Sequence, residues 1–158
     1  MLTVGCGGKP KNLYFTGDNL QVLFKVAEKI LQQAVNHSKV EYLKIDPILN
    51  FKSLCGVFQH LSSLSKLCIF SCTEFDPCND EDSYYSMKWK ELTNLKVLEF
   101  IEIPKMKYLP EGLRHITTLQ TLRITKCVNL ASIPEWVASL QVLDIKDCAM
   151  VEDQKVLQ

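Results

Sequence analysis

The stretch LQTLRITKCVNLASIPEWVASLQVLDIKDC, residues 119–148, repeats one arrangement of apolar residues. Its first half has the order Leu-x-x-Leu-x-Ile-x-x-Cys from Leu119 to Cys127, and its second half has the same order from Leu140 to Cys148. Almost every residue between these positions differs between the two halves. The repetition indicates that fixed positions build a common structure, while the residues between them are free to change.

The same spacing occurs in five places along the chain. Apolar residues recur three and five positions after the first residue of each unit, and residues at offsets of eight and eleven are also apolar. The units start at Val40, Leu64, Leu95, Leu119 and Leu140. A period of two followed by a longer spacing predicts a short strand, then a turn and a helical or irregular return. This is the pattern of a leucine-rich repeat.

A single unit of this length cannot bury its own apolar side, so neighbouring units must stack. We therefore predict an α/β leucine-rich-repeat solenoid, with a short-stranded parallel sheet on the concave face and a helical or irregular convex side. Residues 1–39 fit the spacing poorly and are predicted to be a partial or degenerate repeat plus a helix, whereas residues 40–158 hold the leucine-rich repeats. Because neither end carries a polar capping repeat, we expect the chain to be a fragment of a longer solenoid.

The 158 residues carry 18 basic and 18 acidic side chains, so the formal net charge is zero. A balanced charge gives no broad field that would attract nucleic acid or an anionic membrane surface. No stretch approaches the length of a membrane span, and the first residues lack the basic start and apolar run of a secretory signal. We therefore expect a cytoplasmic protein without a membrane span and without a nucleic-acid partner.

The seven cysteines occur singly, mostly at apolar positions of the repeat. Their odd number and their placement predict reduced, buried thiols in place of a disulfide framework. Cys72, Cys127 and Cys148 lie where a strand ends, a position at which a thiol can donate to turn carbonyls. Cys78 is predicted to lie in the core. The sequence contains no Cys-x-x-Cys pair, so we expect no zinc site.

No arrangement of residues predicts catalysis. His37, His60 and His115 lie far apart in the repeat spacing, and no Ser or Cys nucleophile is placed to meet one of them with a carboxylate behind it. The sequence GCGGKP at residues 5–10 lacks the spacing and the hydroxyl residue of a phosphate-binding loop. We therefore expect no enzymatic activity, no cofactor and no metal.

The strand residues that alternate with the fixed apolar positions are predicted to point to the concave surface. They can change for a partner at little cost to the fold, so this surface is the candidate protein-binding site. Its predicted residues are Tyr42, Lys44, Lys66, Phe70, Val97, Glu99, Ile101, Arg123, Thr125, Asp144 and Lys146. Cys68 falls in the same alternation and is also predicted to face outward.

Phe70 and Ile101 occupy the same slot on consecutive strands. They form either a small exposed apolar patch or a surface covered by the insertion after Cys72. That insertion includes NDEDSYY at residues 79–85, which is predicted to be a solvated loop or a contact for a basic patch elsewhere.

Glu99, Arg123 and Asp144 share another slot and alternate in sign. The pattern predicts either a lateral charge ladder or a surface that steers a charged partner. Trp89 and Trp136 are predicted to pack between repeats.

Three features of the sequence together resemble a known family. They are the Leu/Ile-Pro-Glu phrase at residues 109–111 and 133–135, the Leu-x-x-Leu-x-Ile-x-x-Cys unit, and the acidic insertion CNDEDSYYSMKWKELTNL that leads back into a strand. Over roughly residues 53–151 the chain resembles the C-terminal leucine-rich-repeat region of plant NLR disease resistance proteins of the coiled-coil type. The resemblance does not extend to a nucleotide-binding domain, so it implies no ATPase activity here.

This resemblance implies a protein-binding module of a plant intracellular immune receptor, active in the defence response. The expected partners are a pathogen effector or a guarded host protein, and the nucleotide-binding domain of the parent receptor, which such repeats hold in its resting state. An alternative is the substrate-recognition arm of an F-box ubiquitin ligase, because those adaptors also use cysteine-containing leucine-rich repeats.

Overall fold

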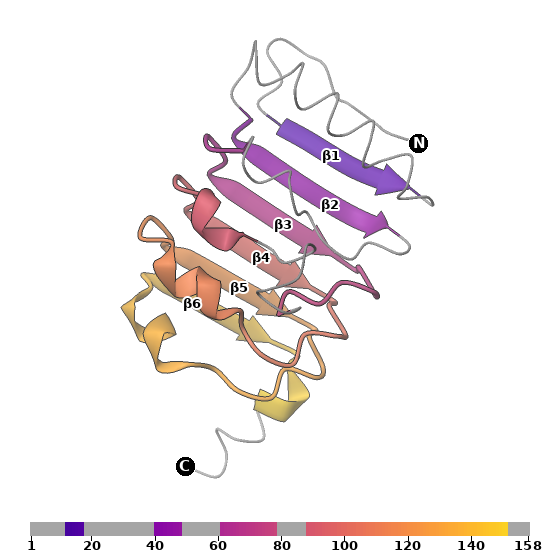
Figure 1. Ribbon diagram of the computed structural model, residues 1–158. Helices are drawn as coiled ribbons and strands as arrows, with labels where there is room; N and C mark the ends of the chain where they lie inside the picture. The colour runs from indigo at the N-terminus through magenta and orange to yellow at the C-terminus, as the bar shows by residue number, and fades with distance from the viewer. Residues whose placement is uncertain (1–11, 18–39, 49–60, 79–87, 152–158) are drawn as a thin grey trace.

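The computed structural model describes residues 12–17, 40–48, 61–78 and 88–151. Within these residues six parallel strands form one sheet, and their order in the sheet is their order in the chain (Figure 1). The strands are β1 (Asn12–Gly17), β2 (Tyr42–Ile48), β3 (Lys66–Phe70), β4 (Val97–Ile101), β5 (Thr121–Thr125) and β6 (Val142–Lys146). Each strand therefore pairs only with the strands immediately before and after it in the chain.

The strands pair in the register that the sequence spacing predicts. Leu98 in β4 lies between Leu67 of β3 and Leu122 of β5. The same row continues to Leu43 in β2 and Leu143 in β6. The result is an α/β arrangement, a parallel sheet with few helices, and it is consistent with a repeat solenoid.

The fixed apolar residues form one buried cluster on one side of the sheet. Leu98, Phe100 and Leu122 have no exposed surface. The return segments contain the 3-10 helices η2 (Trp89–Glu91), η3 (Glu111–His115) and η4 (Glu135–Ser139), which lie on one side of the sheet in Figure 1. Leu113 of η3 and Val137 of η4 belong to the same buried cluster, so the helices close the apolar side.

Both tryptophans support this packing between units, as the sequence predicts. Trp89 is buried, and its ring meets the ring of Phe100 edge to face at 6.0 Å between centroids. Gly112 approaches so closely that a Cβ atom there would lie 3.2 Å from Cδ1 of Trp89. Trp136 is partly buried against the cluster.

A residue with positive φ follows each of the last four strands. These residues are Ser71, Glu102, Lys126 and Asp147, with φ values of 53°, 56°, 55° and 54°. Residues other than glycine adopt this conformation at a cost. The cost is offset because the backbone N–H of Ser71 donates to the carbonyl of Ile101, the last residue of the next strand, at 2.8 Å. Glu102 and Lys126 make the equivalent bond, both at 2.9 Å.

The first complete unit lacks this turn for a chemical reason. Pro47 occupies the equivalent position, and its ring holds φ at a negative value. Strand β2 accordingly continues through Pro47 to Ile48, beyond the length of the five-residue strands that follow.

The cysteines at the strand ends lie as predicted. Cys72, Cys127 and Cys148 are fully buried. Their Sγ atoms lie 3.4 Å, 3.6 Å and 3.3 Å from the carbonyl oxygens of Phe70, Thr125 and Lys146, so each thiol can donate at the end of its own strand. The thiol therefore adds a donor at the end of its strand, where the carbonyls of Thr125 and Lys146 also accept from the backbone N–H groups of Glu102 and Lys126.

The prediction that Cys78 lies in the core is wrong. Cys78 is exposed, and its Sγ donates to the carbonyl of Tyr108 at 3.0 Å. The preceding Pro77 is the buried residue at this point of the chain. The spacing holds through Phe75, which is buried as predicted, and fails at the next repeat position, where Pro77 takes the buried place expected for Cys78.

Strand β1 belongs to the part of the chain that fits the spacing poorly. It nevertheless pairs in parallel with β2, with Leu13 beside Leu43 and Phe15 beside Ile45. The helix predicted within residues 18–39 and the acidic insertion at residues 79–85 lie outside the described residues.

Candidate functional site

The strand residues that alternate with the buried ones form a second face of the sheet, which we call the variable face. Strand pairing aligns them in three rows. The rows are Tyr42–Lys66–Val97–Thr121–Val142, Lys44–Cys68–Glu99–Arg123–Asp144 and Phe70–Ile101–Thr125–Lys146. Every residue predicted for the binding surface lies in one of these rows, so the structure brings the predicted residues together on one face.

An ion-pair network occupies the middle of the variable face. Nη1 of Arg123 lies 2.9 Å from Oε1 of Glu99, and Nζ of Lys66 lies 3.2 Å from the same oxygen. Asp144 pairs instead with Lys146 in its own strand, at 3.0 Å. The predicted ladder of alternating charge is therefore present from Arg123 to Glu99, and its extension to Asp144 is replaced by a pair within β6.

Aromatic rings and lysines alternate on the first strands of this face. The rings of Tyr14 and Tyr42 meet edge to face at 5.7 Å. Nζ of Lys66 lies 5.3 Å from the centroid of the Tyr42 ring, and Nζ of Lys44 lies 5.4 Å from that of Phe70. These are cation–π distances, and they fix the long lysine side chains over the sheet. Tyr14 was missed by the sequence analysis because the spacing does not reveal β1.

Phe70 and Ile101 are direct neighbours in the sheet, as their shared slot predicts. Both side chains are half-buried, so they offer part of their apolar surface to a partner. Val97, at the start of β4, is half-buried as well. Residues 79–87 of the insertion after Cys72, the alternative cover for this patch, lie outside the described residues.

The predicted exposure of Cys68 on this surface is corrected by the structure. This residue lies in the middle row but is only 3% exposed, because the longer side chains of Lys44 and Glu99 flank it in the same row. Burial, with a further contribution from Glu99, raises the pKa of the Cys68 thiol to about 11. The thiol therefore stays protonated at neutral pH, where it shares a hydrogen bond with Glu99.

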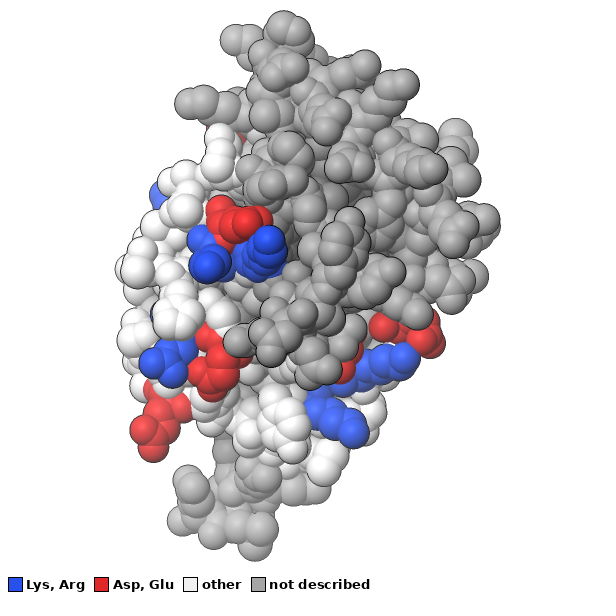
Figure 2. Space-filling view, viewed as in Figure 1, with Lys and Arg blue, Asp and Glu red and all other residues white. Residues whose placement is uncertain are grey.

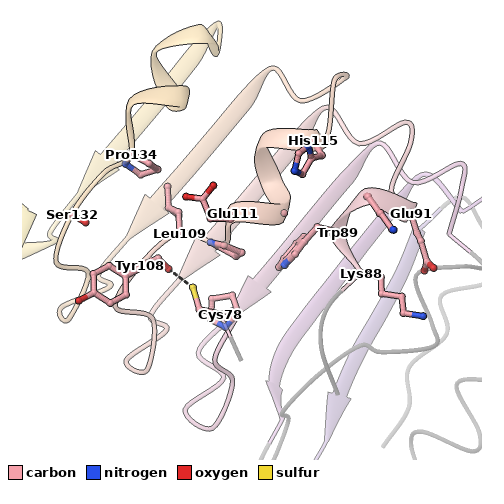
Figure 3. Close-up of a pocket in the computed structure, with 14 residues that line it drawn as sticks. Cys78, Lys88, Trp89, Glu91, Tyr108, Leu109, Glu111, His115, Ser132 and Pro134 are labelled. Atoms are coloured by element: carbon pink, nitrogen blue, oxygen red, sulfur yellow. Dashed lines mark hydrogen bonds between the residues drawn. The ribbon is translucent and has the colours of Figure 1, made fainter. Parts of the chain in front are cut away.

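A hollow of 880 Å³ lies on the side of the sheet that carries the 3-10 helices (Figure 3). The residues drawn around it come from three consecutive units, among them Cys78, Trp89, Tyr108 and His115. Desolvation of the sulfur raises the pKa of the Cys78 thiol to about 11, although the residue as a whole is exposed. A nucleophilic cysteine needs the opposite shift, so this thiol is not activated for catalysis.

Charged side chains are mixed on the face shown in Figure 2. Lysine and arginine lie beside aspartate and glutamate in small groups, and the described residues of this face form no broad area of one sign. Within the same part of the chain, no three His, Cys, Asp or Glu side chains gather in a way that could hold a metal ion. No helix that the structure describes has the length and apolar character needed to cross a bilayer.

A buried face of fixed residues and an opposite face of changeable ones define an α/β protein with a parallel sheet of repeated strand units. The chain is 24% identical over 150 residues to the disease resistance protein RPS4 of Arabidopsis thaliana. The inactive disease resistance protein RPS4 of the same plant gives the same identity over the same length. The aligned part covers 85% of this chain but only 12% of either relative.

No family model matches the chain. No solved structure matches it either. The chain is thus distantly similar to a short part of a plant disease resistance protein.

Proposed function

We propose that the chain is a leucine-rich-repeat module of a plant intracellular immune receptor and that it works by binding protein. Its concave surface is the variable face, and its partner is a pathogen effector or a guarded host protein, or the nucleotide-binding domain of the parent receptor. The module is not an enzyme and acts in the cytoplasm. The observation that carries the proposal is the alignment of all predicted binding residues in three rows on one face.

The mechanism is differential binding. If the variable face binds the resting receptor and a foreign or guarded protein with different affinities, arrival of the second partner shifts the receptor between two states. The face suits this role because its residues change from unit to unit while the buried rows stay apolar. The same separation makes the binding surface adjustable without loss of the fold.

The test is a pull-down from plant cell extract, with retained proteins identified by mass spectrometry. The wild-type chain is compared with a variant that carries Phe70→Glu, Ile101→Glu and Arg123→Glu on the variable face. A matched control carries Lys105→Glu and Arg114→Glu, two exposed cations outside that face. Circular dichroism first establishes that all three proteins are folded.

We expect the wild type and the control to retain a receptor nucleotide-binding domain, or a pathogen or guarded protein, and the variable-face variant to lose it. Identical partners for all three proteins would contradict the proposal and place binding elsewhere. Capture of a core subunit of a ubiquitin ligase would instead favour the substrate-recognition arm of such a ligase.

A further inference from the structure

The centre of the variable face carries an unbalanced charge. Lys66 and Arg123 both contact one oxygen of Glu99, at 3.2 Å and 2.9 Å. Asp46, which follows the buried Ile45 in β2 and so also lies on this face, pairs with Lys44, and Asp144 pairs with Lys146. One positive charge therefore remains in excess around Glu99.

The exposure of these side chains shows which of them a partner can reach. The side chain of Glu99 is only 14% exposed, whereas those of Lys66 and Arg123 are 37% and 44% exposed. Glu99 also shares a hydrogen bond with the thiol of Cys68, which occupies a further part of its accepting capacity. The carboxylate is thus enclosed by its donors, whereas the two more exposed cations carry several N–H groups each and can donate to a further acceptor.

Apolar surface lies beside this cationic centre. Val97 is the sheet neighbour of Lys66, and Phe70 and Ile101 lie two rows away on the same strands. All three side chains are half-buried. A charged pair gains strength next to apolar groups that exclude water, which is the usual setting of an interface hot spot.

We infer that the variable face takes an acidic segment of a partner protein, whose carboxylate binds between Lys66 and Arg123 while a neighbouring apolar residue packs on Phe70 and Ile101. This inference deepens the proposed function and rests on it. Nucleic acid is the less suitable anion, because the excess is a single charge and the chain as a whole has no net charge.

Substitution of Glu99 predicts the direction in which peptide affinity should change. As an internal carboxylate it competes with the partner for the same two cations. Glu99→Gln keeps the shape of the side chain and an acceptor for the Cys68 thiol, but removes the competing charge. Acidic peptides are therefore expected to bind more tightly to Glu99→Gln and more weakly to Lys66→Gln/Arg123→Gln. If Glu99 had only a structural role, Glu99→Gln would weaken peptide binding, as Lys66→Gln/Arg123→Gln does.

A phage-displayed library of random peptides is selected on the immobilised wild-type chain, and selected peptides are measured by fluorescence anisotropy against each folded variant. We expect an excess of Asp and Glu in the selected peptides. Loss of the two cations should weaken binding by roughly tenfold, and Glu99→Gln should strengthen it by a similar factor. Phe70→Glu/Ile101→Glu should abolish binding.

The outcomes separate the two proposals. Peptides that lose binding with Phe70→Glu/Ile101→Glu but show no acidic excess would overturn the acidic partner and leave the binding face intact. If the wild-type chain retained peptides no better than the Phe70→Glu/Ile101→Glu chain, both the acidic partner and the binding face would be overturned. A short single-stranded oligonucleotide whose binding tightens with Glu99→Gln would make nucleic acid the partner and would also overturn the inference.

Discussion

Strands β5 and β6 carry nearly the same apolar phrase and differ in how much of it they bury. Leu122 in β5 and Leu143 in β6 are paired neighbours at the same repeat position. Leu122 has no exposed surface, whereas Leu143 is 40% exposed. The reason is that β5 has a strand on either side and β6 has only β5 beside it among the described residues. The phrase determines where a side chain points, and the neighbouring unit determines whether it is buried.

The largest effect is expected when a charge replaces the leucine at each of these two positions. Leu122→Asp places a carboxylate in the buried cluster, where nothing can pair with it, and is expected to unfold the sheet. Leu143→Asp is expected to leave a folded protein with a modestly lower melting temperature, because water already reaches the site. Circular dichroism with thermal melting measures both. A folded Leu122→Asp protein would show that the repeat positions are wrongly assigned.

The cysteines after the two strands are the next matched pair. Cys127 and Cys148 are both fully buried, despite the different burial of the leucines before them. We expect Cys127→Ala and Cys148→Ala to lower the free energy of unfolding by similar amounts, about 1–2 kcal/mol, since each deletes a small buried group and a donor to a carbonyl. Urea denaturation measures the difference. A much smaller loss for Cys148→Ala would show that the turn after β6 is exposed as β6 is.

Alkaline pH tests the buried thiol of Cys127 directly. Burial raises the pKa of this thiol from 9.0 to about 11, so the folded state holds its proton over a range in which the unfolded chain has lost it. The stabilisation is complete below pH 9 and is lost as the pH rises toward 11. The free energy of unfolding should fall over this interval, and fall less steeply in Cys127→Ala. Equal slopes for both proteins would place the loss elsewhere.

The residues with positive φ form a third pair, Lys126 after β5 and Asp147 after β6. Aspartate tolerates this conformation better than lysine. Lys126→Gly is therefore expected to raise the free energy of unfolding by about 0.5–1 kcal/mol, and Asp147→Gly by less. Urea denaturation of the two variants decides the point. Destabilisation by Lys126→Gly would mean that the ion pair of Lys126 with Glu102 outweighs the relief of strain.

The smallest effect is expected on the variable face. Arg123→Gln removes a cation that is 44% exposed, while Lys66 still pairs with the same oxygen of Glu99, so the free energy of unfolding should change by about 0.5 kcal/mol or less. Thermal melting at low and high salt measures the change. A loss several times larger would show that the network around Glu99 supports the fold and is not free to vary.

The repeat spacing predicted the strands from β2 to β6, their parallel pairing and the rows of the variable face. It succeeded because each apolar position is confirmed independently by several units. Strand β1 escaped it, since Pro10 and Asp18 stand where other units have apolar residues. Cys78 was misplaced because Pro77, one position earlier, takes the buried place in the unit that starts at Leu64.

The residues of the site were predictable, but their contacts were not. The alternation along each strand placed Glu99, Lys66 and Arg123 on one face. It could not indicate that both cations would meet at one oxygen, because that depends on side-chain conformations chosen among several neighbours. Nor could it show that Cys68 is buried, since a short side chain in a row of long ones is covered by them.

The strict chain order of the sheet has a mechanical consequence. Every strand is bonded only to the strands next to it in sequence, so tension applied to the two ends of the sheet loads the edge strands first and leaves the inner strands bonded. The sheet would open strand by strand, as in other stacked repeats, and each release would add a similar length of chain. A protein of this kind unfolds in steps under tension and keeps the rows of the variable face intact in its remaining units.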